Sequence, residues 1–288
     1  MTISVNGLLT TYGSLTQVEL NYLFTAVSYG NTTATPPTNY VFIGKVDSWA
    51  DENHPDIATQ DQYTLKKLAK NMVAAKLILT SNLAAVVPRF DWVTGTLYSQ
   101  YTDYQDIFTF DDNGIMSNKF YVRNNVDQIF KCLFNNNGAA STVQPVLSPG
   151  NTNPGQALTL SDGYKWIYVT TIDKGLKQKF FDEDWMPIAI GSNTPNTISG
   201  VKMGSVDVIN VTNSGNNYSN GLSTVTVTIT GDGSDATAYA NVTSNVISDI
   251  IVTNSGNNYT YATVSLSPAV GYTGSDATAN AIISPIGG

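Results

Sequence analysis

The segment Leu83–Trp92, with the sequence Leu-Ala-Ala-Val-Val-Pro-Arg-Phe-Asp-Trp, joins an apolar run to an alternating one. Pro88 cannot donate a backbone hydrogen bond, and it biases the residue before it away from helical angles, so extended structure is expected here. In a strand, Arg89 and Asp91 would lie on one side and the two aromatic residues on the other. The two charges predict either a fixed ion pair that anchors the segment or an exposed pair of small energetic effect.

The composition around this segment favours β-structure. Charged residues make up 12% of the 288 residues, about half the usual share. The sequence contains three glutamates but many Asn, Thr, Ser and Gly residues, so strong helix formers are scarce. The predicted fold class is mainly β (α+β), with antiparallel β-sandwich domains, one principal amphipathic helix and a C-terminal tandem β repeat.

Charge and cysteine content exclude several classes of protein. A net charge of −8 argues against binding to nucleic acid or to an anionic membrane, because both need a surplus of Lys and Arg. The apolar stretch 65–87 contains four lysines, which is incompatible with a membrane span. Cys132 is the single cysteine, so no internal disulfide forms. The first residues do not resemble a secretory signal, and folding in a cytoplasm is expected.

The first half of the chain predicts a strand, a helix and a hairpin. The β-branched and aromatic run 40–46 predicts a buried strand. Residues 59–61 offer helix N-caps, and an apolar stripe follows them at helical spacing. The stripe consists of Leu65, Leu68, Met72, Ala75 and Leu79. Asp111–Gly114 predicts a tight turn of a hairpin between 107–110 and 120–122.

Two further strands are expected before the end of this region. The run 129–134 predicts a buried strand, and residues 138–160 have the composition of a loop. The segment Asp162–Thr170 predicts an alternating strand whose aromatic residues share one face. These residues are Tyr164, Trp166 and Tyr168. A loop-like stretch at 192–200 predicts a boundary between a core domain, 1–198, and a C-terminal module, 199–288.

The C-terminal module contains a tandem repeat. The sequence Val-Thr-Asn-Ser-Gly-Asn-Asn-Tyr occurs at 211–218 and again at 252–259, an offset of 41 residues. Gly-Ser-Asp-Ala-Thr-Ala occurs at 233–238 and 274–279 with the same offset. Two anchors with one offset indicate a duplicated unit, with repeats at about 206–246 and 247–288. Each repeat predicts three strands, which would form a small sandwich or a pair of stacked hairpin modules.

None of the patterns that carry known chemistry is complete. The single histidine, His54, lies in an acidic loop, so hydrolysis by a nucleophile–histidine pair and a zinc site both lack residues. The acidic run 182–184 beside Trp185 does not supply the two opposed carboxylates of a glycosidase. Gly231–Asp235 has the composition of a calcium loop but too few carboxylates, and a turn is the better interpretation. The aromatic strand at 164–168 could stack sugars, although such strands more often form cores. We therefore predict no catalytic residue, no metal and no cofactor.

An ordered series of motifs resembles a known family. In order, the chain contains Tyr-Val-Phe-Ile-Gly-Lys-Val-Asp-Ser-Trp (40–49), Ala-Val-Val-Pro-Arg-Phe-Asp-Trp (85–92), Gly-Thr-Leu-Tyr (95–98), Ile-Phe-Lys-Cys-Leu (129–133) and Asp-Gly-Tyr-Lys-Trp-Ile-Tyr (162–168). This series resembles the baseplate wedge subunit of contractile-tailed bacteriophages of the T-even type, the one present as a dimer in each wedge. The resemblance covers residues 20–190, and the two repeats stand in place of the family's C-terminal region.

The resemblance implies a structural protein rather than an enzyme. It implies a homodimer in a viral tail baseplate that contacts other wedge proteins and is assembled in the host cytoplasm, with no nucleic acid or membrane bound. The residues that match the family's motifs are expected to act as structural or interface residues. They are Trp49, Arg89, Asp91, Trp92, Tyr164 and Trp166. The alternative is a receptor- or glycan-binding tail fibre or spike module, with the repeats as its working part; a polysaccharide-cleaving enzyme is a third interpretation.

Overall fold

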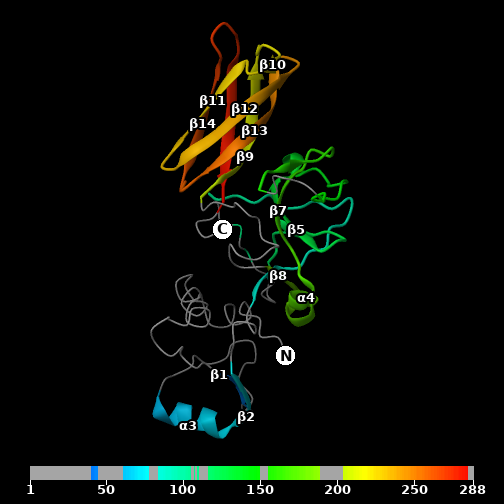
Figure 1. Ribbon diagram of the computed structural model, residues 1–288, viewed down its shortest axis with the longest axis vertical. Coiled ribbons are helices and arrows are strands. Elements are labelled where there is room, and N and C mark those ends of the chain that lie inside the picture. Colours follow the sequence, from blue (N-terminus) through cyan, green and yellow to red (C-terminus); the bar gives the residue numbers. More distant parts are fainter. Residues whose placement is uncertain are drawn as a thin grey trace. The chain divides into compact units, whose positions relative to one another are not determined.

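The protein is mainly β and is described by a computed structural model (Figure 1). The described residues are 40–44, 61–77, 84–104, 107, 109, 116–149, 155–188 and 204–284. The chain divides into two compact units, Met1–Val86 and Val87–Gly288. The stretch near residue 198, where the sequence predicts a domain boundary, lies outside the described residues.

The described part of unit 1 contains a helix and a two-stranded antiparallel sheet. Strand β1 (Tyr40–Gly44) pairs with β2 (Met72–Leu77), and helix α3 (Gln62–Lys70) precedes β2. The predicted strand at 40–46 and the first half of the predicted helix are confirmed. The prediction that the helix continues to Leu79 is wrong, because residues from Met72 onward pair with β1. The sheet supplies backbone hydrogen bonds that override the apolar spacing of this stretch.

Unit 2 begins with a four-stranded antiparallel sheet in the order β4-β5-β7-β6. Its strands are β4 (Tyr121–Arg123), β5 (Gln128–Phe134), β6 (Leu158–Thr159) and β7 (Lys165–Thr171). The predicted strand at 129–134 is confirmed, and the strand predicted at 162–170 is confirmed from Lys165 onward, since residues 162–164 form a turn before it. The predicted turn at Asp111–Gly114 lies outside the described residues. A short second sheet pairs β8 (Trp185–Ile188) with β3 (Ala85–Pro88), and helix α4 (Lys174–Phe180) joins β7 to β8.

An aromatic core packs against the four-stranded sheet. The side chains of Tyr164 and Trp166 are fully buried, and Phe120 and Phe130 pack in the same cluster. Ile167, on the opposite face of β7, is also buried. Strand β7 is therefore covered on both faces, which the alternation of its sequence did not predict.

The repeats form a seven-stranded antiparallel sheet that nearly closes into a barrel (Figure 1). The strand order is β10-β12-β13-β9-β15-β14-β11. The strands are β9 (Val206–Asn216), β10 (Gly221–Leu222), β11 (Val225–Gly231), β12 (Ser234–Thr243), β13 (Val246–Asn257), β14 (Ala262–Pro268) and β15 (Ser275–Ile283). The two repeats thus share one continuous sheet instead of forming two stacked modules.

The repeats exchange strands around a pseudo-two-fold axis. Strand β12 of the first repeat pairs with β13 of the second, while β15 of the second repeat pairs with β9 of the first. Ile209 faces Ile250 across β9 and β13, and Thr226 faces Ser267 across β11 and β14. Both pairs join residues 41 positions apart, so each links equivalent positions of the two repeats. The axis therefore passes through both pairs, and neither repeat completes its own strand pairing.

The octapeptide that is identical in the two repeats forms a tight corner of the sheet in each of them. Gly215 and Gly256 both have positive φ, and a Cβ atom at either would collide with a backbone carbonyl of the other repeat and with a tyrosine ring. Those rings belong to Tyr218 and Tyr259, which are almost fully buried. Each glycine is thus required twice, for its backbone conformation and for the close approach of a strand and a ring.

We predict that Gly215→Ala destabilises the protein more than Gly271→Ala does. Both glycines have positive φ, but nothing lies within 4 Å of a Cβ atom at Gly271. The control should cost about 1–2 kcal/mol for the left-handed backbone, and Gly215→Ala roughly 1–3 kcal/mol more for the steric conflict. Urea unfolding of the full chain measures both, and equal unfolding free energies would contradict this account of the corner.

Candidate functional site

Two of the sequence motifs meet in unit 2 through the side chain of Ser141. Trp92 donates a hydrogen bond from Nε1 to Ser141 Oγ over 3.1 Å, and Ser141 Oγ donates to Asp162 Oδ2 over 3.1 Å. Asp162 Oδ2 also accepts hydrogen bonds from the backbone N–H groups of Thr142 and Val143, at 2.8 and 3.0 Å. The carboxylate thereby fixes the segment after Ala139 and connects it to Trp92.

The electrostatics of this cluster favour the charged form of Asp162. Burial raises the pKa of the carboxyl group, but the backbone N–H groups of Val143, Thr142 and Tyr164 and the Ser141 hydroxyl more than offset it. The pKa therefore lies below its ordinary value, as expected for a carboxylate that accepts several hydrogen bonds.

The aromatic residues of the same motif lie behind Asp162 in the core. The Tyr164 and Trp166 rings stack with centroids 5.6 Å apart, and Tyr98 contacts Trp166 edge-on at 5.5 Å. Tyr164 Oη donates to the backbone oxygen of Ala139 over 2.5 Å. Because both rings of the motif are fully buried, they are not available as a platform for stacking a sugar.

The charges of the opening segment belong to a larger ion-pair network. Asp91 is paired with Arg89 at 2.7 Å and with Arg123 at 2.6 Å. Arg123 is also paired with Asp127, at 2.7 Å, and Asp127 with Lys177, at 2.7 Å. Five side chains thus alternate in sign from the segment after β3 to helix α4. The ion pair expected between Arg89 and Asp91 is present, and it is half-exposed.

An aromatic ring supports the cations of this network. The guanidinium carbons of Arg89 and Arg123 lie 4.5 and 4.8 Å from the centroid of the Phe181 ring, and Lys177 Nζ lies 5.3 Å from it. Arg89 also donates to the backbone oxygen of Asp182 over 2.8 Å. The network therefore holds the segment after Pro88 against the α4–β8 connection, and its cations are engaged with carboxylates and with a ring.

The repeat barrel is fixed to the four-stranded sheet by two ion pairs. Lys131 of β5 lies 3.1 Å from Asp207 of β9, and Lys165 of β7 lies 2.6 Å from Asp249 of β13. The Lys131 and Asp207 side chains are only 8% and 3% exposed. Asp207 also accepts hydrogen bonds from the Ser284 hydroxyl. Burial lowers the pKa of Lys131, but the charges of Asp207 and of nearby tyrosines outweigh it and leave the pKa raised.

Apolar and amide contacts complete this junction. Val208 and Ile282, paired across β9 and β15, point out of the barrel and join the core of the four-stranded sheet. Asn210 donates from Nδ2 to the backbone oxygen of Leu133 over 3.0 Å, in the buried part of the contact. The barrel therefore rests on the sheet through a packed interface in which the Asn210 amide nitrogen is hydrogen-bonded, while its buried Oδ1 has no hydrogen-bond partner among the described residues.

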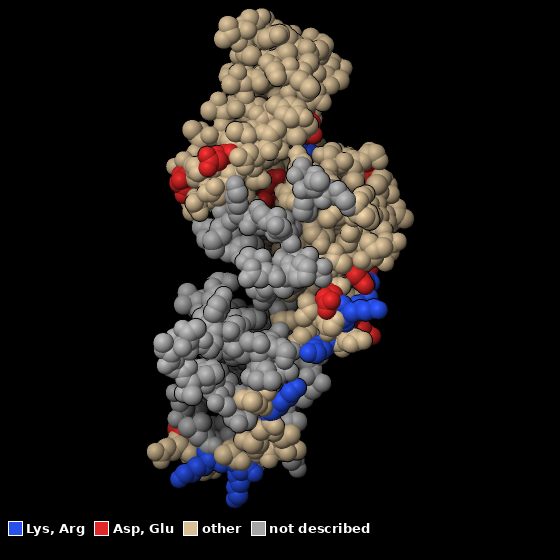
Figure 2. Space-filling model, viewed as in Figure 1, with Lys and Arg blue, Asp and Glu red and all other residues tan. Residues whose placement is uncertain are grey.

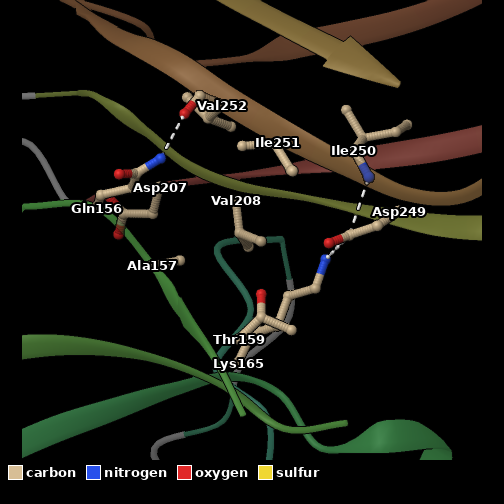
Figure 3. Close-up of a pocket in the computed structure, with 10 residues that line it drawn as sticks. All are labelled: Gln156, Ala157, Thr159, Lys165, Asp207, Val208, Asp249, Ile250, Ile251 and Val252. Carbon is tan, nitrogen blue, oxygen red and sulfur yellow. Dashed lines mark hydrogen bonds and ion pairs between the residues drawn. The ribbon is translucent and has the colours of Figure 1, made fainter. Parts of the chain in front are cut away.

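A small cavity lies at the junction, beside the ion pair of Lys165 (Figure 3). In Figure 3, the ammonium group of Lys165 points at Asp249, and Gln156 reaches the backbone oxygen of Val252. The cavity measures about 30 Å³, whereas sites for organic ligands measure about 300–1,000 Å³. It is therefore large enough for water but not for a sugar or an organic cofactor.

The predicted site residues fall into three groups. Arg89 and Asp91 belong to the ion-pair network, and Trp92, Tyr164 and Trp166 belong to the Asp162 cluster and the core behind it. Trp49 lies outside the described residues, as does His54. The sequence pattern did not indicate Ser141, Arg123 or Lys131. Apart from Asp127, which lies four residues after Arg123, their partners are distant in the sequence, and Ser141 stands in a stretch with the composition of a loop.

Other candidate groups have structural positions. Cys132 is fully buried, and burial raises the pKa of its thiol. In the calcium-like loop, Asp232 accepts hydrogen bonds from the Thr260 hydroxyl and the backbone of Thr260 and Tyr261, which lowers its pKa to about 2. Within the described ranges, no three His, Cys, Asp or Glu residues are grouped so as to hold a metal ion. Nor does any helix there have the length and apolarity to cross a membrane.

The stability of the protein should fall with acid because Asp91, Asp127 and Asp162 all have lowered pKa values. A carboxyl group with a lowered folded-state pKa stabilises the fold above its unfolded value, about 3.9, and this stabilisation is lost as the pH falls through the folded pKa. We expect Asp162→Ala to cost about 1–3 kcal/mol at neutral pH and to make the loss below about pH 4 shallower.

Urea unfolding as a function of pH measures this effect. Asp184→Ala, which removes an exposed carboxylate from unit 2, is the matched control and should leave both the stability and its pH dependence close to wild type. A wild-type slope below pH 4 in the Asp162→Ala variant would contradict the role assigned to this carboxylate.

The buried ion pair should show strong coupling between its two members. Lys131→Met leaves Asp207 without its counter-ion and should cost about 3–5 kcal/mol. Adding Asp207→Asn should recover part of this loss, because the uncompensated charge is removed. Lys174→Met, at an exposed lysine of α4, should change the unfolding free energy by less than about 0.5 kcal/mol. Additive costs in the double variant would show that the pair is not coupled.

Comparison with models of known protein families and with the sequences of curated proteins finds no match for this chain. The ordered motifs and their arrangement in unit 2 are therefore the basis for assigning a function.

Proposed function

We propose that this protein is a structural component of a bacteriophage tail baseplate, a wedge subunit that acts through contacts with other wedge proteins. In this role it catalyses no reaction, binds no cofactor, forms a homodimer and is incorporated into the virion after assembly in the host cytoplasm. The observation that carries the proposal is the convergence of the ordered motifs within unit 2. Segments 89–92, 95–98, 129–133 and 162–168 lie in one connected cluster.

The contacts inside this cluster account for the order of the motifs. Gly95 has positive φ and donates from its backbone N–H to the oxygen of Ser141, and Ser141 donates back to Thr96. The chain then leads to Tyr98, whose ring contacts Trp166, while Ser141 holds Trp92 and Asp162 together. Each motif thus stabilises another, so they are parts of one folded unit. This mutual dependence supports the comparison with the wedge subunit better than any single motif does.

A structural role also agrees with the polar groups that were considered for chemistry. The carboxylate of Asp162 is occupied by hydrogen bonds, and the charges of Asp91 and Asp127 are paired with cations. The cavity beside Lys165 is too small for an organic substrate. These groups are placed to hold segments together, which is the property that a building block of a large assembly requires.

One observation favours the alternative, a glycan- or receptor-binding fibre module. The outer surface of β11 and β14 carries a ladder of exposed hydroxyl groups that face one another across the two strands. They belong to Thr226, Thr228, Thr230, Thr263, Ser265 and Ser267. Such a neutral polar surface is compatible with carbohydrate, and a fibre module would assemble as a trimer.

Light scattering behind a sizing column distinguishes the two proposals. We expect a mass of about 62 kDa, twice the 30.9 kDa of the chain, because the wedge role implies a two-fold assembly. A mass near 93 kDa, about three chains, would contradict the wedge subunit and favour the fibre module. A monomer at every concentration would contradict the homodimer in the proposal.

A further inference from the structure

One end of the repeat barrel carries exposed apolar side chains. Leu222, Val270 and Tyr272 are 62%, 102% and 49% exposed. They belong to the β9–β11 connection (217–224) and the β14–β15 connection (269–274), which lie with the β12–β13 turn (244–245) at the upper end of the barrel in Figure 1. These three connections are called the end loops here. Every residue from 204 to 284 is described, so the loops and the strands that carry them are complete.

Hydrogen bonds hold the end loops against one another. Ser219 donates from its backbone N–H to the oxygen of Thr273 over 3.3 Å, and the N–H of Tyr218 donates to the oxygen of Asn245 over 3.0 Å. Asn220 Oδ1 in turn accepts from the N–H of Asn245 over 2.8 Å. The three loops therefore form one preformed surface, and little conformational entropy is lost when a partner binds to it.

The repeat symmetry shows that the fold does not require apolar residues at these positions. Equivalent positions of the two repeats are 41 residues apart, so the equivalents of Leu222, Val270 and Tyr272 can be read from the other repeat. They are the exposed Thr263, the half-buried strand residue Ile229, and Gly231. The same scaffold is thus built with a hydroxyl, a strand residue and a glycine where the end loops expose apolar side chains.

The end loops also lack charge. They contain no charged residue, although the chain has a net charge of −8. The position equivalent to Thr273 in the first repeat is Asp232, an exposed carboxylate, so a charge that the scaffold accepts is missing at this end. In Figure 2, the upper end of the barrel shows neither acidic nor basic side chains, and Asp276, the first charged residue after the loops, belongs to β15.

This absence of charge favours a second copy of the chain as the partner. Two copies that each carry a net charge of −8 repel each other least where they meet through an uncharged surface. Homodimer interfaces are also more apolar than other protein surfaces. The end loops comprise eight, two and six residues, fewer than the roughly 20–30 that each side of a standard interface contributes, so a reversible dimer is expected.

We propose that the end loops are the surface through which two copies of this chain associate. Leu222, Val270 and Tyr272 of each copy are buried against the end loops of the other, in a contact with two-fold symmetry. This inference rests on the proposed function for the existence of the homodimer, and it names the surface that forms it.

Paired charge variants at Val270 test the proposal. Val270→Asp and Val270→Lys each place like charges in the contact, so each should weaken self-association about tenfold or more. The mass from light scattering should fall from about 62 kDa, two chains, toward the 30.9 kDa of one chain. An equimolar mixture of the two variants should recover the dimer, because opposite charges then meet. The Val270 side chain is fully exposed, so both variants should fold, which circular dichroism verifies.

A matched control and an uncharged variant separate the contact from general effects of charge. Val146→Asp, at a residue of unit 2 that is 44% exposed, should leave the mass unchanged. Leu222→Ser should weaken association without changing the net charge. Raising the salt concentration from about 50 to about 500 mM should leave the dimer unchanged or strengthen it, because salt screens the repulsion between acidic copies.

Hydrogen exchange locates the contact directly. Residues 217–224 and 269–274 should gain protection as the wild-type protein is concentrated, and the Val270→Asp variant should not show this gain. Protection that appears elsewhere in the chain would overturn the proposal. A dimer that persists in both Val270 variants, or a mixture of them that stays monomeric, would do the same.

The outcomes for this surface and for the wedge proposal can be told apart. A wild-type dimer that none of the Val270 and Leu222 variants weakens would overturn the end-loop contact and leave the wedge proposal standing. A wild-type trimer, or a monomer at every concentration, would overturn both the end-loop dimer and the homodimer on which it rests. A glycan that binds a monomeric wild type and protects the end loops would assign this surface to carbohydrate instead.

Discussion

The buried ion pair between Lys131 and Asp207 is the constraint on which the arrangement of unit 2 depends. Residues 204–284 contain five aspartates and no lysine or arginine, so each cation that neutralises a barrel aspartate must come from outside the barrel. Strands β5 and β7 supply one lysine each, to Asp207 and to Asp249. A buried charge without its partner is expensive, whereas the pair itself adds little net stability. The two pairs therefore select one docking position for the barrel, and the apolar contact of Val208 and Ile282 provides the attraction.

The position of the two aspartates also shows how a symmetric barrel makes an asymmetric contact. The pseudo-two-fold axis relates Asp207 to Ser248 and Asp249 to Val208, so neither carboxylate has a charged equivalent in the other repeat. The residues that are identical in the two repeats lie instead at the corners, where Gly215 and Gly256 permit strand exchange. The two repeats thus have the same residues where the sheet bends, and they have different residues where the barrel meets the four-stranded sheet. Strand exchange has the further consequence that the two repeats depend on each other for backbone pairing.

The sequence predicted those features that depend on local pattern. The strands β5 and β7, the fold class, the repeat offset and the first half of α3 follow from periodicity and composition, and the structure confirms them. Helix α3 ends at Lys70 because the residues after it pair with β1, a contact across about 30 residues that no local pattern reveals. Ser141 was equally hidden. It stands in a stretch of loop-like composition, and its importance comes from Trp92 and Asp162, which lie far from it in the sequence. The Arg89–Asp91 pair was visible, but Arg123 and Phe181, which extend it, were not.

The described regions of the chain differ in how many charged residues they contain and in how those charges are paired. The barrel contains acidic and neutral polar residues, and two of its aspartates form ion pairs with lysines of the neighbouring sheet. The cations after Pro88 are held by carboxylates and by the ring of Phe181, so they are committed to the fold. The segment 61–77 has the opposite balance, with four lysines and one aspartate. Its lysines are exposed, so water and salt screen their charge. Among the described residues, charge is therefore buried where the barrel meets the four-stranded sheet and is exposed on α3 and β2.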